Sequence, residues 1–159
     1  MPVKAIPEGY HSITPYLTCR DAARAIEFYQ RAFGATLKGG VAKGPDGKVM
    51  HAELIIGDSV IMLGDEYPAF GSPSPQTIGG SASGLHIYVE DVDSAFDRAV
   101  KAGATVETPV ADMFWGDRYG KLRDPFGHKW SIATHTADLS VEEMKHGMEE
   151  AMAKMPKSA

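Results

Sequence analysis

The chain has 159 residues, 43% of them hydrophobic, which is enough to bury the core of one compact domain without disulfides or a structural metal. Its formal net charge of -5 is spread over mixed acidic and basic residues with no basic run that would follow a phosphate backbone, so we expect no nucleic-acid partner. The single cysteine, Cys19, cannot form an internal disulfide, and no apolar stretch has the length of a signal peptide or a membrane span. We therefore expect a cytoplasmic protein with no membrane partner.

The first predicted elements are a strand over residues 13–19 and an amphipathic helix between Asp21 and Gly34. Apolar residues recur at helical spacing between these two, Asp21 can accept hydrogen bonds from the first turn, and Gly34 suits the left-handed position after the last turn. Three strand-like stretches follow, at about residues 36–42, 49–56 and 59–63.

The same order of elements recurs about 70 residues later. The run Gly34-Ala-Thr-Leu returns from residue 103 as Gly-Ala-Thr-Val, and Asp21 returns as Asp91 before the second helix. The second set of strands is predicted at about residues 85–89, 105–110, 118–123 and 128–134. The sequence therefore predicts an α+β fold built from two tandem βαβββ modules.

The modules are joined by a stretch rich in proline, glycine and serine, and we expect one domain over residues 1–159. Its predicted parts are a first module at 10–65, a linker at 66–84 and a second module at 85–135.

A C-terminal helix is predicted over residues 138–155. Ser140 and Glu143 have the spacing of a capping box, which marks the start of a helix. One helical face carries a methionine stripe, formed by Met144, Met148, Met152 and Met155. We expect this stripe to pack on the body of the protein or on a dimer partner.

Two groups of residues resemble the vicinal-oxygen-chelate superfamily, which comprises glyoxalases, bleomycin-resistance proteins and dioxygenases. They are Tyr16-Leu-Thr-Cys-Arg-Asp with Phe28-Tyr and Phe33-Gly, and Asp124-Pro-Phe-Gly-His-Lys-Trp. The PhnB-like branch is similar in further segments, namely His51-Ala-Glu-Leu, Phe114-Trp-Gly-Asp-Arg-Tyr-Gly and Asp124-Pro-Phe-Gly followed by Trp130. The resemblance implies curved mixed sheets around a cavity for a small molecule, and a homodimer.

The resemblance also implies where a divalent metal would bind, because metal-using members hold it from the first and last strand of each module. Alignment of the repeat places these positions at Thr14, Ile61, Gly84 and Ser131, or two residues further at Tyr16, Leu63, His86 and Ala133. Neither set supplies the nitrogen and carboxylate ligands that such metals need, so we expect no metal and no other cofactor. The alternative is a relocated site of two histidines and one carboxylate, His51, Glu53 and His86.

Strand alternation selects the candidate catalytic residues. It turns His51, Glu53 and His86 toward the cavity. Glu53 has apolar neighbours, so we expect desolvation to raise its pKa, as a proton-abstracting base requires. His51 and His86 could move protons or orient an oxyanion. The alternatives are a structural carboxylate and packed histidines.

Six further residues are candidates for ligand binding. Trp115 could stack on a planar ligand and Arg118 could clamp an anion, unless Arg118 pairs with Asp117 or with a dimer partner. The other four are expected to line the cavity, namely Thr14, Tyr16, Tyr88 and Ser131.

Four possibilities remain open from the sequence, three functional and one structural. The protein is an enzyme acting on a small oxygenated metabolite with Glu53 as base, or it binds a drug or metabolite without chemistry, as a resistance or sequestration protein does. A metal-dependent lyase, isomerase or dioxygenase would need the relocated site. A dimer whose cavity is filled by its own side chains is the structural alternative.

Overall fold

The computed structural model describes residues 3–156, and in it the first half of the sequence forms a mixed sheet with one helix. In chain order its elements are β1 (Tyr16–Cys19), α1 (Ala22–Phe33), β2 (Thr36–Leu37), β3 (Ala42–Lys43), β4 (Val49–Ile56) and β5 (Ser59–Asp65). The strands are ordered β1-β5-β4-β2 with β3 paired to β4, and β1 runs parallel to β5.

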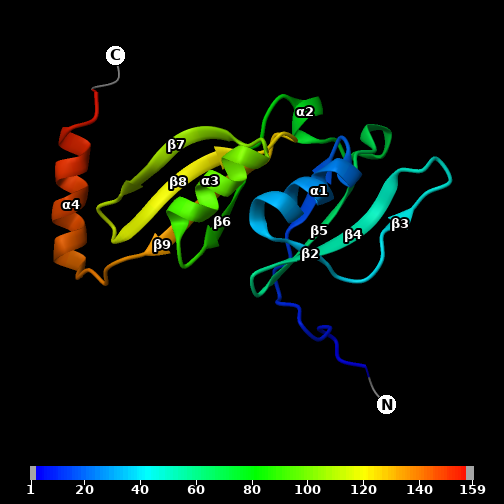
Figure 1. Cartoon of the computed structure of the whole chain (residues 1–159), viewed down its shortest axis with the longest axis horizontal. Helices are drawn as coiled ribbons and strands as arrows, with labels where there is room; N and C mark the ends of the chain where they lie inside the picture. The colour runs from blue at the N-terminus through cyan, green and yellow to red at the C-terminus, as the bar shows by residue number, and fades with distance from the viewer. Residues whose placement is uncertain (1–2, 157–159) are drawn as a thin grey trace.

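The second half of the sequence repeats this arrangement (Figure 1). Its elements are β6 (Gly84–Tyr88), α3 (Val92–Ala102), β7 (Thr105–Asp112), β8 (Asp117–Arg123) and β9 (Lys129–His135). The order is β6-β9-β8-β7, and β6 runs parallel to β9. The predicted α+β architecture of two tandem βαβββ modules is confirmed.

The helix α1 lies between Asp21 and Gly34, and α3 lies between Asp91 and Gly103. The side chain of Asp21 accepts a hydrogen bond from the backbone N–H of Arg24 at 3.1 Å, and that of Asp91 accepts one from Ser94 at 3.0 Å. Gly34, with φ of 66°, ends α1 in the left-handed conformation that glycine adopts without strain.

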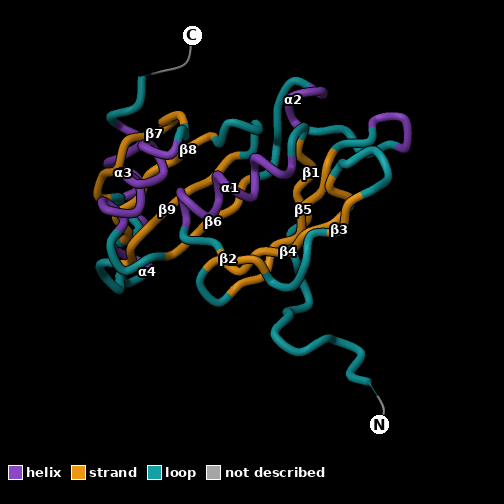
Figure 2. Tube along the Cα trace, turned by 45° about the vertical axis from the view of Figure 1, so that its right-hand side comes forward, coloured by secondary structure: helices purple, strands orange, loops and turns teal. Residues whose placement is uncertain are grey.

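The helices α1 and α3 pack side by side, each against its own sheet (Figures 1 and 2). Alternate strand residues point toward them, so the row Leu17, Leu63 and Ala52 is buried. The neighbouring row turns the other way, and Tyr16 in it is 51% exposed. We call the sheet surfaces turned away from the helices the open faces.

The open faces carry two equivalent rows of side chains. In the first module Tyr16 pairs with Met62, which pairs with Glu53. In the second module the corresponding row is His86, Ser131 and Lys121.

The expected metal positions are wrong in β5, because Ile61 and Leu63 point to the helix and are almost fully buried. The two hairpins differ in length. Ile56 pairs with Ser59 across two residues, whereas Arg123 pairs with Lys129 across five. A constant shift of 70 residues therefore aligns β5 with β9 one residue out of register. An error of one residue places a side chain on the opposite face of the sheet.

Ile13, the first residue of the predicted strand, is 86% exposed. The strand predicted over residues 13–19 begins only at Tyr16, so Ile13 lies ahead of the sheet and the alternation does not apply to it.

The linker holds two short helices, the 3-10 helix η1 (Pro68–Phe70) and α2 (Pro75–Ile78). Glu66 anchors it, because its carboxylate accepts hydrogen bonds from the Thr77 hydroxyl at 2.6 Å and the Ser74 backbone N–H at 2.8 Å. These bonds, with smaller help from Arg20, lower the pKa of Glu66 to about 2.

The C-terminal helix α4 (Val141–Ala153) begins with the predicted capping box and lies at the far end of the second sheet (Figure 1). It approaches the turn between β7 and β8, where Gly147 lies so close to Phe114 that a Cβ on Gly147 would meet the Phe114 Cβ at 2.9 Å. The methionine stripe is not covered by the body of the chain, since its members are between 39% and 68% exposed. No helix within residues 3–156 is long and apolar enough to cross a membrane.

A buried carboxylate joins the two modules. Asp124, 4% exposed, accepts hydrogen bonds from the Tyr29 hydroxyl of α1 at 2.6 Å and from the Trp130 indole of β9 at 2.9 Å. It also accepts the backbone N–H groups of Phe126 and His128 in its own hairpin turn. All four donors point at one side chain, so its removal leaves several of them unpaired.

We predict that Asp124→Asn lowers the free energy of unfolding by about 2–4 kcal/mol. The amide NH₂ group replaces one accepting oxygen of the carboxylate, so the donors that bonded to that oxygen lose their acceptor. Urea unfolding at neutral pH measures this loss. The matched control is Asp97→Asn, whose exposed ion pair with Lys101 should contribute less than about 0.5 kcal/mol. Equal effects of the two substitutions would contradict the role of Asp124.

Candidate functional site

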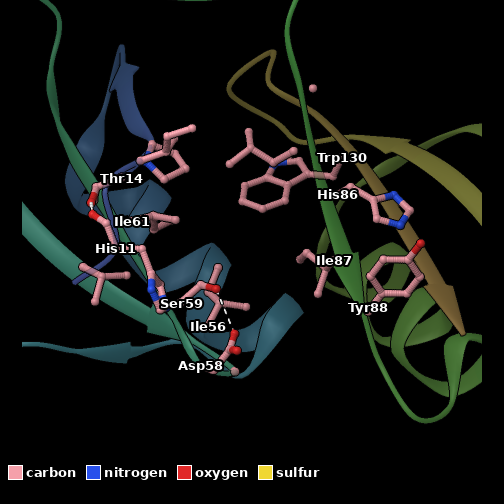
Figure 3. Close-up of a pocket in the computed structure, with 16 residues that line it drawn as sticks. His11, Thr14, Ile56, Asp58, Ser59, Ile61, His86, Ile87, Tyr88 and Trp130 are labelled. Atoms are coloured by element: carbon pink, nitrogen blue, oxygen red, sulfur yellow. Dashed lines mark hydrogen bonds between the residues drawn. The ribbon is translucent and has the colours of Figure 1, made fainter. Parts of the chain in front are cut away.

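A cleft of about 750 Å³ lies between the two modules (Figure 3). One wall comes from the β4–β5 hairpin and the chain before β1, the other from β6, with Trp130 between them. Of the predicted site residues, Thr14, His86 and Tyr88 line this cleft. It combines apolar walls with a few polar side chains, which is the usual character of a small-molecule site.

Four side chains of the second module form an aromatic platform on its open face, namely His86, Tyr88, Trp115 and Tyr119. The His86 ring lies 4.6 Å from the Tyr88 ring in an edge arrangement and stacks on Tyr119 at 5.9 Å with an interplanar angle of 22°. Trp115 lies 5.4 Å from Tyr119. Because His86 and Tyr88 also line the cleft, the platform borders it.

The platform is oriented by Asp117, which is 4% exposed. Its carboxylate accepts the Tyr88 hydroxyl at 3.2 Å, the Trp115 indole N–H at 3.0 Å and the Nδ1 of His135 at 2.7 Å. Burial raises the pKa of Asp117, but the hydrogen bonds from His135, Trp115 and Tyr88 outweigh it and lower the pKa below its ordinary value. Asp117 therefore stays ionised and holds both rings in place.

A second polar group lies on the open face of the first sheet. Glu53 accepts a hydrogen bond from the hydroxyl of Tyr10, and its other oxygen lies 3.1 Å from the Nε2 of His51. Hydrogen bonds from Tyr10 and then from His51 lower the pKa of Glu53, so the expected rise is wrong. The apolar neighbours of Glu53 along the strand point to the other face, and Tyr10 was not foreseen as its partner.

Arg118 does not face the cleft. Its guanidinium pairs with both carboxylate oxygens of Asp93 at 2.7 and 2.8 Å and with Asp112 at 3.2 Å. Its partner Asp93 belongs to α3, so the side chain reaches toward the helix and does not form the alternative pairing with Asp117. A guanidinium engaged by two carboxylates has little capacity left for a ligand anion.

The remaining predicted residues have hydrogen-bond partners on the open faces or in the segment before β1. The hydroxyl of Ser131 lies 2.7 Å from the Nδ1 of His86, and that of Tyr16 donates to the backbone oxygen of Met50 at 3.3 Å. Thr14 donates to the backbone oxygen of His11 at 3.4 Å.

The side chains of this chain do not fit the metal site of the family. On the open faces, the paired positions of first and last strands are Tyr16 with Met62 and His86 with Ser131, so only one imidazole is present. The relocated set is not assembled either, because Glu53 and His51 lie together on the first sheet and His86 does not join them. Within residues 3–156 no three histidine, cysteine or acidic side chains come together as a metal site would require.

The model of the Glyoxalase/Bleomycin resistance protein/Dioxygenase superfamily matches residues 9–132. The chain belongs to this superfamily. An uncharacterized protein of Mycobacterium tuberculosis, Rv0887c, is 44% identical over 140 residues, which cover 86% of this chain and 82% of that protein. The expected superfamily is thus confirmed.

Solved structures of the superfamily share the fold. TioX from Micromonospora sp. ML1 is 27% identical with a TM-score of 0.59, over 82% of this chain and all of that one. A PhnB protein from Bacillus cereus is 18% identical with a TM-score of 0.60, over 78% of this chain and 99% of that one, a likeness of fold alone.

Proposed function

We propose that this protein binds a small planar molecule by stacking on the aromatic platform. The observation that carries the proposal is that two rings of the four-membered platform, His86 and Tyr88, line the cleft, with Tyr88 63% exposed and held by the buried Asp117. Exposed rings with fixed orientation bind planar groups at low conformational cost. Glu53 has a lowered pKa and the donor set does not fit a metal, so binding needs fewer assumptions than catalysis.

A homodimer is part of the same proposal. The open faces expose large side chains that a second copy would enclose, among them Tyr16 at 51% and Tyr88 at 63%. Apolar patches of this kind on a soluble protein mark interaction surfaces. The polar residues on the same faces would then lie around an enclosed space rather than in open solvent.

A second candidate is proton transfer with His51 as the base and Glu53 as the carboxylate that orients it. The contact of 3.1 Å between Glu53 and the His51 Nε2 supports it, as does the lowered pKa of Glu53, because an ionised carboxylate orients an imidazole. This assignment exchanges the roles expected from the sequence.

For the platform, we predict that Tyr88→Ala weakens the binding of planar aromatic compounds by about threefold to tenfold, because one stacking surface is lost. Dissociation constants for compounds found by a thermal-shift screen measure the effect. Tyr88→Phe is the control, since it keeps the ring and loses only the hydroxyl bond to Asp117. Equal affinities for Tyr88→Ala and the wild type would remove the platform from the site.

For the dimer, sedimentation equilibrium should give twice the mass of the chain. Tyr16→Glu places a charge on the open face and should weaken the dimer by about tenfold or more. Phe70→Glu, at an 87% exposed position in the linker, is the control. A monomeric wild type at high protein concentration would contradict the proposed assembly.

For the second candidate, the test is exchange of ligand C–H hydrogen for deuterium in D₂O, followed by NMR. His51→Gln should slow the exchange by about 100-fold or more, the effect of losing a general base, and Glu53→Gln should slow it less. If the wild type exchanges no hydrogen of any bound compound, the catalytic candidate is excluded and binding remains.

A further inference from the structure

The side chain of Tyr10 packs on the open face of the first sheet, although Tyr10 itself belongs to neither sheet. It belongs to the segment before β1, of which residues 3–9 are exposed and run away from the sheet (Figure 2). Tyr10 itself is half-buried, because its hydroxyl bonds to Glu53 on β4 and its ring lies under the Nζ of Lys38 at 3.6 Å. Within residues 3–10, Tyr10 is thus the residue whose side chain bonds to the first sheet.

The three groups around this ring form a site for a phenol. Glu53 supplies an acceptor for the hydroxyl, His51 holds the other oxygen of Glu53 at 3.1 Å, and Lys38 covers the ring face. An ionised carboxylate accepts strong hydrogen bonds from a neutral hydroxyl, and an ammonium group is attracted to an aromatic face. We call Lys38, His51 and Glu53 the phenol subsite.

The attachment of Tyr10 is local and can open without unfolding a sheet. The segment contributes no strand to either sheet, and the backbone N–H of Tyr10 bonds only within the segment, to the oxygen of Pro7 at 3.2 Å. A segment with few buried contacts opens at a small part of the global free energy of unfolding. A ligand that makes the same contacts can therefore replace Tyr10.

We propose that Tyr10 is an internal occupant of a ligand subsite, and that the ligands of this protein carry a hydroxyaryl group that takes its place. The ligand hydroxyl donates to Glu53, and its ring lies under Lys38. This inference rests on the proposed small-molecule binding and specifies the chemical class of the ligand. It also gives Glu53 and His51 a role in recognition that requires no proton transfer.

The test uses 4-methylphenol, which has the structure of the tyrosine side chain, and Tyr10→Ala, which vacates the subsite. NMR titration should show binding to Tyr10→Ala that is at least about tenfold tighter than to the wild type, the effect expected of a charge-assisted hydrogen bond no longer subject to competition. The amides of Lys38, His51 and Glu53 should report the binding. The methyl ether 4-methylanisole cannot donate a hydrogen bond and should gain nothing.

Two further variants control for indirect effects. Tyr10→Ala combined with Glu53→Gln should lose the gain, because the ionised acceptor is removed. Tyr67→Ala is the matched control, since the Tyr67 ring also lies under a lysine, with Lys48 at 5.0 Å, but away from Glu53. It should leave the affinity for 4-methylphenol unchanged.

The inference is overturned if Tyr10→Ala and the wild type bind 4-methylphenol equally, or if the methyl ether gains as much as the phenol. These outcomes are separate from the test of the platform. If planar ligands depend on Tyr88 but Tyr10→Ala does not strengthen phenol binding, the proposed function stands and only the hydroxyaryl class of ligand is removed. If Tyr10→Ala strengthens phenol binding but no ligand depends on Tyr88, the phenol subsite stands and the platform is removed.

Discussion

The buried carboxylate of Asp124 is the interaction on which the rest of the structure depends. It connects a helix of the first module to the last strand of the second through Tyr29 and Trp130, whose rings also lie 5.3 Å apart. Burial of a charge is costly unless its hydrogen bonds are satisfied, and here four donors satisfy it. Since β9 pairs with both β6 and β8, fixing Trp130 also fixes the strands that carry His86, Tyr88 and Tyr119.

The two open faces use a carboxylate in different ways. Asp117 is buried beneath three donors and raises the pKa of the Tyr88 phenol through its charge, which keeps that hydroxyl protonated as a donor. Glu53 is more open, with 19% of its side chain exposed, and one of its three polar neighbours comes from a segment outside the sheets. Asp117 fixes the orientation of the platform rings, whereas Glu53 accepts a hydrogen bond from a side chain that a ligand can replace.

The repeat made the fold predictable, because each helix carries its own start and stop signals and the βαβββ order follows from spacing alone. The face of β5 was not predictable from a constant shift, since the hairpins of the two modules differ in length and nothing in the repeat reveals where the residues are lost. The environment of Glu53 was missed for another reason. Tyr10 lies 43 residues away and before the first predicted strand, so strand alternation could not identify it as a partner.

The partners of Arg118 were missed for a similar reason. Asp93 lies 25 residues earlier, on the helix that covers the other side of the sheet. Sequence proximity favoured Asp117, but adjacent residues of a strand point to opposite faces. Side-chain identity thus indicated which residues carry polar chemistry, whereas the register decided which of them meet.

The equivalent rows of the open faces differ in charge, with Glu53 in the first module where Lys121 stands in the second. A duplicated fold with identical halves would present the same electrostatic potential at the equivalent positions of both modules, and a ligand could bind in either of two orientations. Opposite charges at equivalent positions make those orientations unequal in energy. The difference in charge between the two modules therefore allows a polar ligand to bind in one preferred orientation.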